Sequence, residues 1–126
     1  MKLKLNFVLG QRTVNGRFYE PEMMKQQFHE LFSKNEKIPV GPDSDCIDDQ
    51  TGKVPDDKIV GYATTYNINE DGTVEFEVTE LSEATESYLT NNPDQIKMTI
   101  FGFGGIDNNK NIQTFNLTSL FMTMDG

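Results

Sequence analysis

The chain has few of the residues that build covalent links, metal centres and membrane spans. Among its 126 residues there are one cysteine (Cys46), one histidine (His29) and no tryptophan. A single cysteine excludes an intrachain disulfide, and a single histidine excludes a metal site made of several histidines. No stretch approaches the ~20 apolar residues that cross a bilayer. The short, interrupted apolar run over residues 3–9 does not fit a signal peptide.

Basic residues are also scarce. Eleven lysines and arginines stand against 20 aspartates and glutamates, which gives a formal net charge of −9 at pH 7. Such a chain repels nucleic acid and anionic membranes unless its basic residues cluster. We therefore expect no nucleic-acid partner and no membrane partner. The length and the ordinary hydrophobic and charged fractions, 36% and 25%, predict one folded domain over residues 1–126.

Apolar periodicity predicts an α+β fold. Leu3, Leu5, Phe7 and Leu9 recur at every second position, which is typical of a half-buried strand. Similar patterns predict further strands, and helical spacing of apolar residues predicts two helices. The predicted strands cover residues 3–9, 58–66, 74–79, 96–103 and 112–124, and the predicted helices cover 21–33 and 82–90.

Capping and turn residues support these boundaries. Pro21 fits the first turn of a helix, and Ser82 fits an N-cap. We expect the second helix to turn Ala84, Tyr88 and Leu89 inward and to stop at residues 91–93. Turns are predicted at 15–16, 69–72 and 107–110, and residues 37–57 form a long polar loop. Together the elements predict a small, mostly antiparallel β-barrel or strongly bent sheet with two helices packed on it.

An acidic cluster lies in the long loop. Asp43, Asp45, Asp48 and Asp49 could supply oxygen ligands to a hard cation. An EF-hand pattern would need an acidic or amide residue at position 47 and glycine at 48, and Ile47 and Asp48 break it. We favour a solvated loop and keep a weak cation or partner site as the alternative.

Catalytic candidates are weak. A hydroxyl nucleophile needs an adjacent base, and the candidate hydroxyls are Thr99, Ser44, Ser87 and Ser119. His29 lies in the middle of a predicted helix without a catalytic motif beside it, so a surface position is favoured. The glycines after Thr99, at 102, 104 and 105, lack the lysine and hydroxyl of a phosphate loop. They favour close packing or a bulge.

Two segments carry a resemblance to a known family. Residues 14–19 are similar to an Asn-x-Asn-x-Arg-x-Tyr-Pro segment, and residues 98–104 align with Gly-Ile-Ser-Ser-Arg-Gly-x-Gly. In this order, and with the strand, turn, strand and helix between them, they resemble the prohead maturation proteases of tailed phages. These are serine proteases related in fold to herpesvirus assemblins, so the resemblance implies a prohead-protease-like fold.

The residues that would carry protease chemistry differ from the family's. The family's catalytic histidine falls near Asp43 and Asp45, where this chain has no histidine. Its two serines become Thr99 and Ile100, and its arginine becomes Phe101. Loss of a base or a nucleophile removes most triad catalysis. The resemblance therefore implies a degenerate site with no catalytic residue, and we expect no cofactor or metal.

The first functional hypothesis is a non-enzymatic auxiliary capsid protein, of the decoration or cement kind. It would be made in the host cytoplasm and sit on the outside of the virion capsid, with the major capsid protein as partner and self-association on the lattice as a further contact. Contacts are expected from the 37–57 loop and from Phe101 and Phe103. Two alternatives stay open: a divergent protease that uses Thr99 and His29, and a prohead core or assembly protein that is lost on maturation.

Overall fold

The computed structural model describes residues 1–92 and 95–124, with the side chain of Met124 excepted. Two helices and a seven-stranded sheet account for most of these residues, which confirms the α+β class. Their bounds are β1 Lys2–Lys4, β2 Phe18–Tyr19, α1 Pro21–Lys34, β3 Ile38–Gly41, β4 Gly61–Ile68, β5 Val74–Thr79, α2 Glu83–Asn91, β6 Ile96–Ile106 and β7 Asn111–Met124. A short 3-10 helix, Asp56–Lys58, precedes β4.

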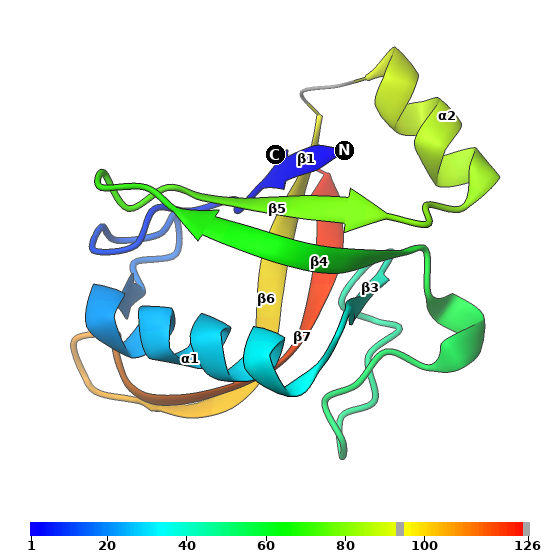
Figure 1. The fold of residues 1–126 in the computed structure, drawn as a ribbon. Helices are drawn as coiled ribbons and strands as arrows, with labels where there is room; N and C mark the ends of the chain where they lie inside the picture. Colours follow the sequence, from blue (N-terminus) through cyan, green and yellow to red (C-terminus); the bar gives the residue numbers. More distant parts are fainter. Residues whose placement is uncertain (93–94, 125–126) are drawn as a thin grey trace.

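The sheet is mixed and curled (Figure 1). Its strand order is β1-β5-β4-β3-β7-β2, and β6 pairs with the other side of β7. The pairs β1–β5, β3–β4, β4–β5 and β6–β7 are antiparallel, whereas β2 and β3 run parallel to β7. Leu5 forms a parallel bridge with Met98, and the Asn6 amide donates to the Met98 carbonyl at 2.8 Å. These contacts draw the two ends of the sheet together into a half-barrel, so the predicted bent, largely antiparallel sheet is confirmed.

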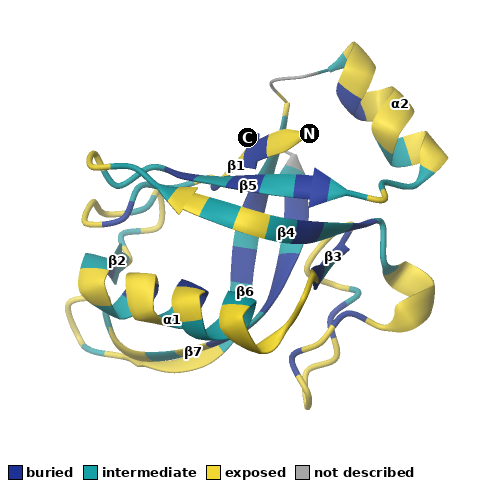
Figure 2. Ribbon diagram, in the orientation of Figure 1, coloured by how far each residue is buried: buried dark blue, intermediate teal, exposed yellow. Residues whose placement is uncertain are grey.

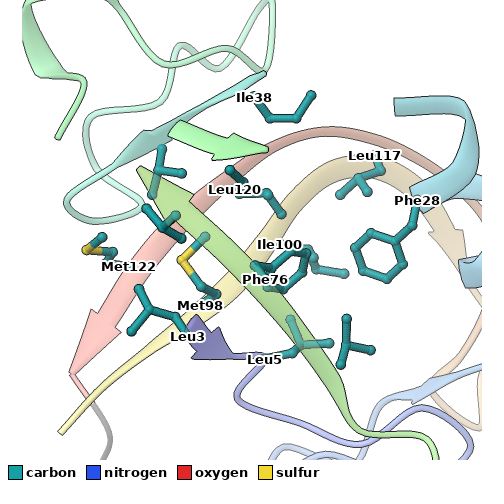
Figure 3. Packing of buried hydrophobic residues seen from close by; sticks show 14 of the residues in the cluster. Leu3, Leu5, Phe28, Ile38, Phe76, Met98, Ile100, Leu117, Leu120 and Met122 are labelled. Carbon is teal, nitrogen blue, oxygen red and sulfur yellow. The ribbon is translucent and has the colours of Figure 1, made fainter. Parts of the chain in front are cut away.

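The core lies between the curled sheet and α1 (Figure 2). Figure 3 shows Phe28 of α1 and Phe76 of β5 turned into the same cluster of apolar side chains, and their rings lie 5.7 Å apart. Burying such aromatic side chains is the main stabilising contribution in a domain of this size. Helix α1 begins where predicted, because the Glu20 carboxylate accepts from the backbone amides of Glu22 and Met23 at 3.1 and 2.7 Å.

Three predicted elements need correction. The strand expected over 58–66 begins at Gly61 and ends at Ile68, because residues 56–58 form the 3-10 helix before it. The strand expected over 3–9 ends at Lys4, because the chain then turns so that Leu5 meets β6 and the Leu9 amide bonds to the Gly72 carbonyl. The loop expected over 37–57 contains β3, whose Ile38 and Val40 are buried between β4 and β7. A four-residue strand with a proline and a glycine gives no alternation, so periodicity missed it.

Helix α2 has the predicted Ser82 cap, whose hydroxyl accepts from the Thr85 amide at 3.3 Å. The prediction of its inward face is mostly wrong. Leu89 is buried, but Ala84 is exposed and Tyr88 is 37% exposed. The helix projects from the end of the sheet (Figure 1), so it has little surface to pack against. Pro93, part of the predicted helix stop, lies outside the described residues.

Candidate functional site

The position that resembles the protease nucleophile lies in a surface groove. Thr99 pairs with Phe121 across β6 and β7, and the loop that precedes β2 runs beside it. The groove has a volume of about 470 Å³ and is lined by Asn6, Phe7, Thr13, Val14, Asn15, Arg17, Tyr19, Thr99, Ile100 and Phe121. Arg17 is the one charged side chain in this lining. The groove therefore combines apolar, amide and hydroxyl groups with a single cation.

This lining lacks a proton acceptor for Thr99. Activation of a hydroxyl requires a base within about 3 Å, and none of the lining side chains is an aspartate, glutamate, histidine or lysine. His29 lies on α1, is exposed and does not line the groove. The structure does not bring Thr99 and His29 together in this groove.

The segment in which the resembled family has its catalytic histidine begins at the same level of the sheet as Thr99. Gly41 of β3 pairs with Phe121, and Phe121 pairs with Thr99. Because β7 separates β3 from β6, the two segments lie two strand spacings apart, roughly 10 Å. Asp43 then turns away to cap its own loop, with its carboxylate accepting from the Cys46 amide at 3.1 Å. Asp43 and Asp45 are exposed, and neither lines the groove.

The remaining degenerate positions divide between the core and the outer face. Ile100 is buried in the core cluster. Phe101 and Phe103 pack edge to face with their ring centres 5.8 Å apart. Phe103 is 42% exposed, as a contact residue should be, whereas Phe101 is only half-buried and presents less surface than predicted.

The acidic loop is packed rather than merely solvated. Ile47 and Val54 are buried, and the Ser119 hydroxyl of β7 donates to the Gly52 carbonyl. The Asp48 carboxylate accepts from the Gln50 amide at 2.8 Å, so it caps a turn. Among residues 1–92 and 95–124, no three acidic, histidine or cysteine side chains are placed to hold a metal ion together.

The sequence did not predict the long-range polar contacts around the β6–β7 turn. The Arg12 guanidinium donates to the Gly16 carbonyl at 2.8 Å, to the Asn109 carbonyl at 2.9 Å and to Asn111 Oδ1 at 3.0 Å. These bonds fix the loop before β2 against the turn. No local motif signals the contacts with Asn109 and Asn111, because these acceptors lie almost 100 positions from Arg12.

Among the described residues, three surface groups have pKa values shifted from their ordinary ones. The Asn111 amide lowers the pKa of the Asp107 carboxyl, and the Thr73 hydroxyl and amide lower the pKa of Asp71. The Glu80 carboxylate raises the pKa of Lys37 through their hydrogen bond. Each cause is a local cap or ion pair, and none of the three residues lines the Thr99 groove.

No protein-family model matches the chain, and no curated protein or solved structure matches it. No helix in the described part of the chain is long and apolar enough to cross a membrane. Any functional proposal must therefore stand on the chain's own contacts and on the resemblance of its two segments.

Proposed function

We propose that the chain is a non-enzymatic auxiliary capsid protein, of the decoration or cement kind, on the outer surface of a tailed-phage capsid. Two of its sequence segments resemble those of the prohead proteases, and we infer a degenerate scaffold of that kind. One observation carries the proposal: the groove at Thr99, where the resembled family has its nucleophile, lacks a base while the fold around it is complete. A protein that binds a shell needs the folded scaffold and does not need the triad.

The net charge of the chain supports a position on the outer surface of the capsid. With a net charge of −9, the chain is repelled by the packaged genome and tolerates the solvent-facing side of the shell. Four aspartates of the acidic loop, at 43, 45, 48 and 49, are exposed.

The outer face of β6 supports a protein contact. Phe101 and Phe103 pack edge to face there, and Phe103 stands at an exposed position beside Gly52 of the acidic loop. Exposed aromatic residues with a polar rim are typical of protein–protein contacts. We assign the contact with the major capsid protein to this pair.

The enzymatic alternative has less support. A protease that uses Thr99 and His29 would need the histidine within hydrogen-bond reach of the hydroxyl, and His29 is exposed on α1 outside the groove. A prohead core protein would share every structural feature described so far and differ in its presence in mature particles.

Substitution of Thr99 by alanine separates the structural and enzymatic hypotheses. In phage that carry Thr99→Ala, capsid-protein cleavage should proceed at the wild-type rate and the variant should be packaged in the wild-type amount. The matched control is Thr65→Ala, an exposed threonine on β4. Gel analysis of proheads and mature particles provides the measurement. Uncleaved capsid protein with Thr99→Ala, and normal cleavage with Thr65→Ala, would overturn the proposal in favour of catalysis.

A further inference from the structure

Asn15 is the one asparagine in the chain that is followed by a glycine. An asparagine can lose its side-chain amide without an enzyme when the backbone nitrogen of the next residue reaches its side-chain carbonyl carbon. Glycine has no Cβ and adopts backbone conformations closed to other residues, so it hinders this approach least. The sequence therefore makes Asn15 the most reactive asparagine of the chain.

The structure places Asn15 at the exposed tip of a tight turn. The Gly16 amide donates to the Thr13 carbonyl at 2.9 Å, and Gly16 has a positive φ of 83°. Both Val14 and Asn15 are exposed. The Thr13 hydroxyl donates to Asn15 Oδ1. This oxygen takes up negative charge when a nitrogen attacks the adjacent carbon, and a donor already placed on it stabilises that charge.

The contacts that hold this turn are on the surface. The Gly16 carbonyl accepts from the Arg12 guanidinium at 2.8 Å, and the Asn15 carbonyl accepts from Lys110 Nζ at 3.1 Å. A Cβ at Gly16 would meet only the Lys110 side chain, at 3.4 Å and beyond. Solvent-exposed hydrogen bonds of this kind open locally at low cost. Such an opening frees the Gly16 nitrogen from the Thr13 carbonyl and lets it reach the Asn15 side chain.

The turn at Asp71 and Gly72 shows the opposite case. The Leu9 amide donates to the Gly72 carbonyl at 2.9 Å, and a Cβ at Gly72 would overlap with the Leu9 carbonyl oxygen. The backbone there is packed against another segment. Its side chain is also a carboxylate, which a nitrogen attacks less readily than an amide. Rearrangement at this second turn would not change the charge of the chain.

We infer that Asn15 is a site of spontaneous deamidation. The Gly16 nitrogen forms a bond to Asn15 Cγ, the bond from Cγ to Nδ2 breaks, and the side-chain nitrogen leaves as ammonia with the proton of the Gly16 amide. Water then opens the cyclic imide at either carbonyl. One opening gives aspartate at position 15, and the other gives isoaspartate, in which the chain runs through the side-chain carbon. The sum of the steps consumes one water and releases one ammonia.

The product changes the charge of the Thr99 groove. Asn15 lines this groove, and Arg17 is the one charged side chain in the lining. Either product places a carboxylate at position 15, so the groove loses its net positive charge and its attraction for anions as the protein ages. This change does not depend on the capsid role.

The turn between β6 and β7 supplies a matched comparison within the same chain. The Lys110 amide donates to the Asp107 carbonyl at 3.1 Å, and Lys110 has a φ of 63°. Asn109 is exposed and occupies the same place in its turn as Asn15 does in the other. The next residue is lysine in place of glycine, so Asn109 should keep its amide.

Incubation of the full chain in water labelled with heavy oxygen, at neutral pH and physiological temperature, tests the inference. Peptide mass spectrometry should find labelled carboxylate at position 15, as aspartate and isoaspartate, and an intact amide at Asn109. Anion-exchange chromatography should show a more acidic species that grows in parallel. An intact amide at position 15 after the same incubation, or equal conversion of Asn15 and Asn109, would overturn the inference.

Two variants of Lys110 test why the turns differ. Lys110→Gly and Lys110→Ala both remove the bond from Nζ to the Asn15 carbonyl, but only the first places a glycine after Asn109. Asn109 should convert about tenfold faster or more in Lys110→Gly than in Lys110→Ala, because only glycine lets the nitrogen approach freely. Circular dichroism establishes that both variants fold. Equal conversion of Asn109 in the two variants would contradict the role given to Gly16.

Discussion

The β4–β5 hairpin and the β6–β7 hairpin differ in how they are covered. Strand β5 buries Val74, Phe76 and Val78 and alternates them with Glu75 and Glu77. It also has a strand on each side, β1 and β4. Strand β6 buries Met98 and Ile100 and then becomes rich in glycine and more exposed. Its named strand partner among the described residues is β7.

Within one sheet, β5 therefore contributes mainly to the stability of the fold, whereas the second half of β6 presents a surface to solvent. Strand β5 places its apolar side chains in the core and its charges outward, and both of its edges are paired, so it has no backbone group left for another chain. The second half of β6 has exposed apolar side chains, and no other described strand pairs with the edge that faces away from β7. Truncation of a buried β5 side chain should therefore lower folding stability more than truncation of an exposed β6 side chain such as Phe103.

Truncating an aromatic residue in each hairpin gives the largest contrast. Phe76→Ala should lower the free energy of unfolding by about 3–5 kcal/mol, the usual cost of removing a fully buried phenylalanine ring. Phe103→Ala should cost about 1 kcal/mol or less, since the ring is partly exposed. Urea unfolding followed by circular dichroism provides both values, measured at a concentration where the chain is monomeric. Equal losses of unfolding free energy in the two variants would show that Phe103 belongs to the core.

Two glycines of β6 provide a finer contrast. A Cβ at Gly102 would overlap with the Asn116 carbonyl oxygen and the Phe115 ring. Gly102→Ala should therefore destabilise by about 1–3 kcal/mol, as overpacking usually does. A Cβ at Gly105 meets only the Thr114 hydroxyl, at 3.3 Å, so Gly105→Ala should change stability by about 0.5 kcal/mol or less. Thermal unfolding of the two variants checks the order. A more destabilising change at Gly105 would contradict the close β6–β7 packing.

Lowering the pH should destabilise both hairpin turns, and this is the smallest of the predicted changes in stability. The carboxyls of Asp71 and Asp107 have pKa values below their ordinary 3.8, because turn amides and hydroxyls donate to them. Their stabilisation is complete above that pH and is lost as the pH falls through the lower folded value. The urea midpoint of the wild type should therefore exceed that of Asp71→Asn or Asp107→Asn at pH 6.5, and the gap should narrow at pH 3. A gap that is equal at both pH values would show that ionisation plays no part in these turns.

The sequence predicts best where a pattern is long and local. Strand β5 and helix α1 were predicted almost to the residue, because strict alternation defines the strand and the Pro21 start defines the helix. The β6–β7 hairpin was predicted for the same reason, with a β6 that extends three residues further.

The sequence fails where long-range contacts decide the structure. Strand β3 is only four residues long and exists because β4 and β7 flank it. The packing of Ser119 on Gly52, which fixes the acidic loop, joins positions 67 apart. At the candidate site, the position of Thr99 on a strand was predicted, but the groove around it depends on the loop before β2. No pattern within any one segment encodes these contacts.

The most direct test of the capsid role is quantitative mass spectrometry of purified mature particles. The intact mass and the copy number of this chain are measured against the major capsid protein. We expect the full-length chain at a fixed, near-stoichiometric ratio to the capsid subunit. Its absence from mature particles together with its presence in proheads would contradict the decoration role and return attention to Thr99 and His29.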